Sequence, residues 1–139
     1  MKKHVLFVET NSDNLLLMSR IVAYMGHHFS HTDEVSAAQE IAATTQVDLI
    51  LATVPSKTEN ALAIVRTLKG DAQLSEIPVV AVVQKQHAEL QEQAFLAGCD
   101  GFLQKPADIR QIQALLAEFL SLSKSALVEE EAESYVAAD

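Results

Sequence analysis

The stretch Val47–Pro55, VDLILATVP, is the strongest strand signal in the chain. Its aliphatic and β-branched residues form a run that is too short for a buried helix, so we predict a strand over Val47–Thr53. Pro55 then marks the start of a loop. A strand that is apolar at successive positions must be covered on both faces, which is typical of a parallel sheet packed between helices.

Weaker runs of the same kind lie on both sides of this stretch. Each of them is too short for a helix, and Pro78 introduces one of them. We predict further strands at Val5–Val8, His28–Thr32, Val79–Val83 and Phe102–Gln104.

Amphipathic segments separate these strands. Their apolar residues recur at spacings of three and four, as on one face of a helix. We predict helices over residues 15–25, 35–45, 60–69, 88–97 and 109–120, with Gly26, Gly70 and Gly98 ending the first, third and fourth. Five strand–helix units in succession predict an α/β fold with a doubly wound parallel sheet, because crossovers between parallel strands are right-handed. Ligands of such sheets bind beyond the carboxyl ends of the strands.

Composition limits the classes of function. The chain has 139 residues and a net charge of −9, of which residues 125–139 carry −5. We therefore expect one domain over residues 1–122 and an acidic tail over residues 123–139. No basic stripe is present to neutralise phosphates, and an acidic surface is repelled by anionic lipid, so neither nucleic acid nor a membrane is an expected partner. A single cysteine and the lack of any apolar run of about 20 residues indicate a cytoplasmic protein.

Four segments resemble the receiver domain of bacterial response regulators, from Lys3 to about Leu122. The runs HVLFVE, VDLIL and IPVVAVV stand where that family has its first, third and fourth strands. The run AGCDGFLQKP, residues 97–106, follows the family pattern Ala-Gly-Ala-x-x-Tyr/Phe-Leu-x-Lys-Pro. The resemblance implies a flavodoxin-like (βα)5 sandwich with strand order 2-1-3-4-5. It also implies an ancestral reaction, in which an aspartate at the end of the third strand accepts a phosphoryl group with the help of Mg²⁺.

Most residues that carry this reaction in the family are replaced here. The phosphoacceptor position holds Thr53, and the acidic pair after the first strand is Glu9–Thr10. The hydroxyl position at the end of the fourth strand holds Val83, whereas Lys105 remains. Phosphoryl transfer needs metal and ammonium groups beside the charged phosphoryl oxygens, and Mg²⁺ prefers carboxylate ligands. We therefore expect a degenerate pocket with no Mg²⁺ or other cofactor, no catalytic residue and no enzyme activity.

The retained lysine has two possible roles. Lys105 is expected to pair with Glu9, with Thr53 as a further hydrogen-bond partner, because a lone lysine and a lone carboxylate in this place would both be costly to bury. The alternative is a remnant sensor of phosphate. The resemblance also implies a cis bond between Lys105 and Pro106.

The resulting hypothesis is a non-phosphorylatable pseudo-receiver that acts as a protein–protein interaction module in two-component signalling. Its surface would be the one that receivers commonly use, formed by the fourth helix, the fifth strand and the fifth helix. It would include Phe102, at the family's aromatic switch position, Gln104 and exposed parts of residues 87–98 and 107–118. We expect the Phe102 ring to be fixed. The partner would be a kinase, a phosphotransfer protein, another regulator or a second copy of the chain in a homodimer. Two alternatives stay open: an unorthodox phosphoacceptor at Thr53 or Ser56, and a small ligand or peptide in the vacated pocket.

Three further features carry weaker functional interpretations. His27, His28 and His31 are close in sequence, but no Cys or acid lies at ligand spacing, so a metal site is not expected. Cys99 is expected to be a small packed side chain rather than a redox group. The acidic tail has apolar residues at helical spacing, so it is either disordered or a helix that packs on the domain, on a second copy of the chain or toward a further domain.

Overall fold

The computed structural model describes residues 2–9, 12–54, 62–84, 89–105 and 107–120, with the side chains of residues 12–14 left aside. In this part of the chain five parallel strands form one sheet in the order β2-β1-β3-β4-β5, which confirms the predicted order. The strands are β1 His4–Val8, β2 His28–Thr32, β3 Leu49–Thr53, β4 Val79–Gln84 and β5 Gly101–Lys105. The helices are α1 Ser12–Tyr24, α2 Val35–Thr44, α3 Ala63–Gly70, α4 Leu90–Leu96 and α5 Ile109–Leu120.

Small corrections concern the ends of the predicted elements. β3 begins at Leu49, two residues later than predicted. The preceding Asp48 carboxylate accepts a hydrogen bond from the backbone N–H of His4, at the start of β1, at 2.9 Å. Gly70 is the last residue of α3 rather than a stop beyond it, and it lacks a positive φ. Gly26 and Gly98 have φ values of 85° and 110°, so they end their helices in the left-handed conformation that glycine tolerates best.

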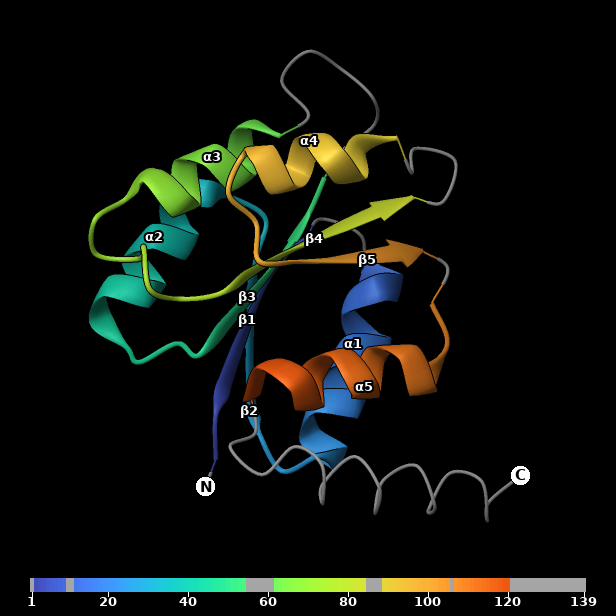
Figure 1. Cartoon of the computed structure of the whole chain (residues 1–139). Helices are drawn as coiled ribbons and strands as arrows, with labels where there is room; N and C mark the ends of the chain where they lie inside the picture. Colours follow the sequence, from blue (N-terminus) through green and yellow to red (C-terminus); the bar gives the residue numbers. More distant parts are fainter. Residues whose placement is uncertain (1, 10–11, 55–61, 85–88, 106, 121–139) are drawn as a thin grey trace.

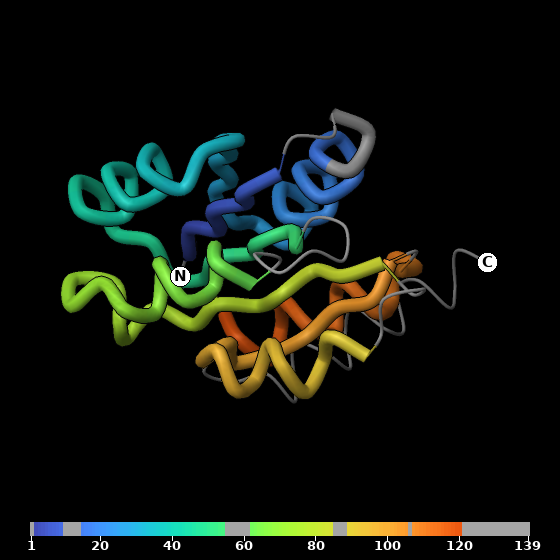
Figure 2. The backbone as a smooth tube through the Cα atoms, turned by 90° about the horizontal axis from the view of Figure 1, so that it is seen from above, coloured from blue at the N-terminus to red at the C-terminus, as the bar shows by residue number. Residues whose placement is uncertain are grey.

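Two layers of helices cover the sheet. α1 and α5 lie on one face, and α2, α3 and α4 lie on the other (Figure 1). Seen from above, α1 and α2 flank β1 from opposite sides (Figure 2). Within the described residues, no helix is both long and apolar enough to cross a bilayer.

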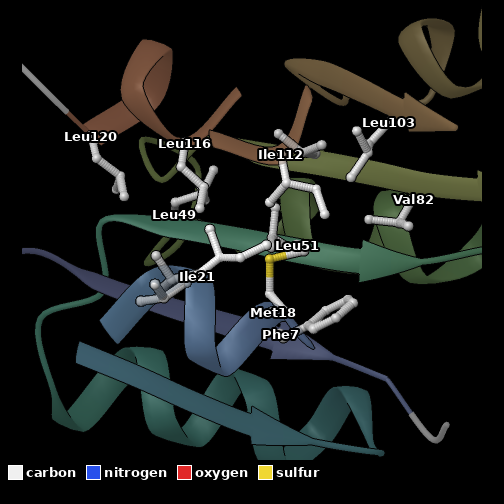
Figure 3. Close-up of a cluster of buried hydrophobic side chains, with 13 residues drawn as sticks. Phe7, Met18, Ile21, Leu49, Leu51, Val82, Leu103, Ile112, Leu116 and Leu120 are labelled. Carbon is white, nitrogen blue, oxygen red and sulfur yellow. The ribbon is translucent and has the colours of Figure 1, made fainter. Parts of the chain in front are cut away.

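Alternate residues of the central strands supply the core of each face. Phe7, Leu51 and Val82 point toward α1 and α5, where they pack with Met18 and Ile112 (Figure 3). The intervening residues of the same strands pack toward the other three helices. Burial of each large aliphatic or aromatic side chain stabilises the fold by roughly 1.5–3 kcal/mol. The apolar continuity of VDLILATVP follows from this burial on both faces.

The parallel arrangement brings the carboxyl ends of all five strands to one edge of the sheet, here called the carboxyl edge. β1 and β3 are neighbours there, with Val8 paired to Ala52, and β4 and β5 are neighbours, with Gln84 paired to Lys105. Residues that are far apart in sequence can therefore meet at this edge.

Candidate functional site

Three of the side chains predicted for the pocket meet at one carboxylate oxygen. The Thr53 hydroxyl donates a hydrogen bond to Glu9 Oε1 at 2.8 Å. The Lys105 ammonium lies 3.4 Å from the same oxygen. Glu9 follows β1, while Thr53 and Lys105 are the last residues of β3 and β5, so three strand ends hold the cluster in place. We call these residues the Glu9 cluster.

Burial makes the Glu9 cluster energetically important. The Glu9 side chain is only 4% exposed, and Lys105 is 18% exposed. A carboxylate buried to this extent needs hydrogen bonds and a nearby cation to offset lost hydration. The 2.8 Å contact of Thr53 has the length of a good O–H···O hydrogen bond, whereas 3.4 Å is long for a charge-assisted N–H···O bond. Thr53 therefore makes the closer contact with this oxygen, and Lys105 contributes mainly its charge.

The chemistry open to this arrangement depends on the Thr53 hydroxyl. An aliphatic alcohol becomes a nucleophile only beside a general base, and Glu9 is placed as such a base. The Lys105 ammonium lies 3.4 Å from the same Glu9 oxygen, so it competes with the Thr53 hydroxyl for that oxygen. The cluster is thus better suited to stable pairing than to proton removal.

Val83 is not part of this polar cluster. It is buried in β4, in a core cluster with Val65, Leu90 and Ala94 beneath α3 and α4. Its aliphatic side chain offers no hydrogen-bond donor or acceptor to the carboxyl edge. Thr10, the remaining residue predicted for the pocket, lies outside the described residues.

Phe102 and Gln104 lie in β5, apart from the Glu9 cluster. The Phe102 ring is half-buried against the core cluster under α4, and its centroid is 6.5 Å from that of Phe95. Leu96 is next to Phe95 in sequence and is highly exposed. Both residues fall within residues 87–98, which were predicted to contribute to the interaction surface. The sequence did not single them out, because two adjacent apolar residues in a helix do not show which of them faces solvent.

The histidines and the cysteine that the sequence offered as weaker candidates form no metal or redox site among the described residues. The backbone N–H of Lys3 donates to His27 Nδ1 at 3.0 Å, while His28 and His31 are exposed. Within the described ranges, no group of three or more His, Cys, Asp or Glu could hold a metal ion. Cys99 is packed in the core under α4, and burial raises the pKa of its thiol, which keeps it protonated. Ser56 and Pro106, and with Pro106 the predicted cis bond, lie outside the described residues.

Comparisons with known proteins agree with this fold. The chain is 27% identical over 120 residues to the polar-differentiation response regulator DivK of Brucella ovis, covering 86% of this chain and 98% of that protein. Chemotaxis protein CheY4 of Vibrio cholerae superposes with a TM-score of 0.75 at 18% identity, over 86% of this chain and all of that one. The receiver domain of the sensor histidine kinase PA1611 of Pseudomonas aeruginosa PAO1, solved with a magnesium ion in its active site cleft, gives a TM-score of 0.70 at 19% identity, over 86% and 98%.

A match to a whole family is more informative than any single relative. The family model described as the response regulator receiver domain matches residues 5–117, which include every described strand except His4 at the start of β1. Receiver domains are signalling modules that interact with kinases, phosphotransfer proteins and other regulators. The order of the strands, the Lys105–Pro106 pair of the sequence and this match together show that the chain belongs to the response regulator receiver domain family.

Proposed function

We propose that this receiver domain is a pseudo-receiver, which signals by binding a protein partner in the cytoplasm and is not phosphorylated itself. The observation that carries the proposal is the Glu9 cluster. The end of β3 presents the Thr53 hydroxyl, and that hydroxyl donates to Glu9 instead of facing an incoming phosphoryl group. Lys105, at the end of β5, is already beside the same carboxylate.

The donors described at this edge do not fit Mg²⁺. The ion takes oxygen ligands in strict octahedral geometry and is normally held by one or two free carboxylates. The Glu9 carboxylate instead accepts the Thr53 proton, and it lies beside a lysine whose charge repels a second cation. Thr10 adds a hydroxyl where the family has a second acid, so the proposed protein works without this metal.

The proposed interaction surface lies on β5 and α4. Phe102 and Gln104 are half-exposed on β5, and the exposed Phe95 and Leu96 extend the apolar area across α4. Aromatic and aliphatic anchors of this kind supply most of the binding energy in protein interfaces. The expected partner is a kinase, a phosphotransfer protein, another regulator or a second copy of the chain.

Incubation of the full chain with a small-molecule phosphodonor and Mg²⁺ tests the proposal. Intact mass spectrometry is expected to detect no added phosphoryl group. A matched variant, Thr10→Asp/Thr53→Asp, returns two carboxylates to the edge and shows that the assay can detect an acyl phosphate in this fold. A phosphoryl group on the natural chain would contradict the proposal.

One contact favours a second function, an unorthodox phosphoacceptor. Thr53 and Glu9 stand at 2.8 Å as a nucleophile and a base would. In that case the phosphodonor would modify the natural chain, and Thr53→Ala would abolish the modification. Retention of the added mass in Thr53→Ala would point to Ser56 or another hydroxyl.

A further inference from the structure

Helix α1 has apolar residues on two opposite faces. Met18, Ile21 and Val22 point into the core beneath it. Leu16 and Leu17 lie on the outer face, where they are 57% and 42% exposed. The same outer face continues to the exposed Tyr24, two turns further along the helix.

The neighbouring helix α5, which covers the same face of the sheet, does not have an apolar outer face. α5 packs beside α1 on the same face of the sheet. Its outer positions include Arg110, Gln111 and Glu118, which are polar and exposed. A surface helix normally has such a polar outer face, whereas a helix that is apolar all round is typically covered by another element.

The described chain ends beside α1. Leu120, the last residue of α5, packs in the same cluster as Ile21 of α1, toward the side where the strands begin (Figure 3). Residues 121–139 continue from this point. Their sequence places Val128, Ala132, Tyr135 and Val136 on one face of a helix, with four glutamates between 129 and 133 on the remaining sides.

We propose that residues 125–136 form a helix that folds back onto the outer face of α1. A helix of this length extends about 18 Å, which exceeds the roughly 12 Å between Leu16 and Tyr24. Residues 121–124 then form the turn, a common length for a connection between antiparallel helices. The apolar face of this tail helix covers Leu16 and Leu17, so other proteins cannot bind the outer face of α1 while the tail is in place.

Charge complementarity supports this occupant over a partner of other chemistry. Arg20 lies in the middle of the outer face, between Leu17 and Tyr24, and is the only charged residue from 15 to 24. Within the described residues, the Arg20 side chain makes no hydrogen bond or ion pair. The tail carries five acids and no base over residues 125–139, so it suits a basic centre framed by leucines.

Limited digestion of the full chain with a glutamyl endopeptidase tests the proposal, because the tail contains the target residues Glu129, Glu130, Glu131 and Glu133. The double variant Leu16→Gln/Leu17→Gln is expected to lose its tail about tenfold faster than the natural chain, since cleavage follows the population of the open form. The matched control is Leu96→Gln, which alters an apolar residue that is 81% exposed on α4. It is expected to be cleaved at the natural rate.

Tail variants make the test independent of the folding of α1. Val128→Gln/Val136→Gln leaves the described domain unchanged and is expected to release the tail to the same extent. Equal cleavage rates in all four proteins would overturn the proposal. Protection that disappears on dilution would also overturn it, because it would mean that the tail covers α1 of a second copy.

Discussion

Lys69 and Lys105 each pair with a carboxylate, but at different ends of the strands. Lys105 lies at the carboxyl edge, and Lys69 lies at the opposite edge, where the strands begin, here called the amino edge. Lys69 contacts Asp100 Oδ2 at 2.9 Å and also donates to the carbonyl oxygens of Ser75 and Ile77, so all three of its N–H groups have acceptors. Asp100 is 40% exposed and precedes β5, whereas the nearly buried Glu9 meets Lys105 where β5 ends.

The two pairs differ in how far water can reach their carboxylates. At the amino edge, Lys69 and Asp100 connect α3 to the start of β5, and water can reach the Asp100 carboxylate. At the carboxyl edge, Glu9 has little access to water, so its hydrogen-bond donor and its cation must come from the protein. The same two charges are thus worth more where the family places its phosphorylation site.

The largest expected effect is that of Lys105→Met. This change keeps the length of the side chain but leaves the buried Glu9 carboxylate without its cation, and we expect a loss of about 3 kcal/mol at neutral pH. The measurement is the free energy of unfolding in urea. Lys69→Met, the matched change at the amino edge, is expected to cost about 1 kcal/mol, because water reaches Asp100.

A double variant identifies the cause of that loss. Glu9→Gln in the Lys105→Met protein removes the negative charge that Lys105 had balanced, so it is expected to recover most of the lost stability. If Lys105→Met and Lys69→Met cost the same, the two edges do not differ in the way described.

The second effect concerns the hydroxyl of the Glu9 cluster. Thr53→Val keeps the shape and the strand preference of the side chain but removes the donor to Glu9, and we expect a loss of about 2 kcal/mol, as for hydrogen bonds to charged groups. Thr67→Val on the exposed side of α3 is the matched control and is expected to change the stability by less than about 0.5 kcal/mol. Equal effects of the two substitutions would show that the 2.8 Å contact contributes nothing.

The third effect is smaller and belongs to the amino edge. Asp100→Ala removes the acceptor for Lys69 and for the Val79 backbone N–H, which bonds the same oxygen at 2.9 Å. We expect a loss of about 1 kcal/mol, because solvent replaces part of both contacts. Asp100→Asn keeps an acceptor for Val79, so chemical denaturation should place it between Asp100→Ala and the natural chain. If Asp100→Ala lost more stability than Lys105→Met, the pair at the amino edge would contribute more to stability than the pair at the carboxyl edge, which would contradict the comparison.

Sequence patterns predicted the strands well, for a physical reason, whereas the order of the strands was implied by the resemblance to the receiver family. A strand that is buried on both faces must be apolar at successive positions, and this leaves a continuous signal such as VDLILATVP. The contacts of Glu9 with Thr53 and Lys105 were also accessible, because ends of parallel strands share one edge. What these contacts mean for phosphorylation stays a proposal.

Other features left no pattern in the sequence. The Lys69–Asp100 pair joins residues 31 positions apart through the loop before β5, and neither spacing nor composition indicates it. The exposure of Leu16, Leu17 and Leu96 depends on which face of each helix meets the sheet. That choice is made by packing and not by local preference.

The smallest expected effect lies at the amino edge and depends on pH. Burial, as the main cause, lowers the pKa of His27 below 6.5, and Nδ1 of the ring accepts the Lys3 N–H, so protonation of Nδ1 breaks this bond. The folded state therefore binds the proton more weakly than the unfolded state. The stability due to neutral His27 is fully present above pH 6.5 and is lost as the pH falls through the folded pKa.

Urea unfolding at about pH 7.5 and about pH 5.5 measures this contribution. We expect the natural chain to lose more stability between the two than His27→Asn does, by a fraction of the roughly 1 kcal/mol of one hydrogen bond. His28→Asn, on the exposed neighbour, should behave as the natural chain. If His27→Asn and the natural chain lose stability equally, protonation of His27 does not affect stability in this pH range. The amino edge would then contribute to stability independently of pH, as the Lys69 contacts do.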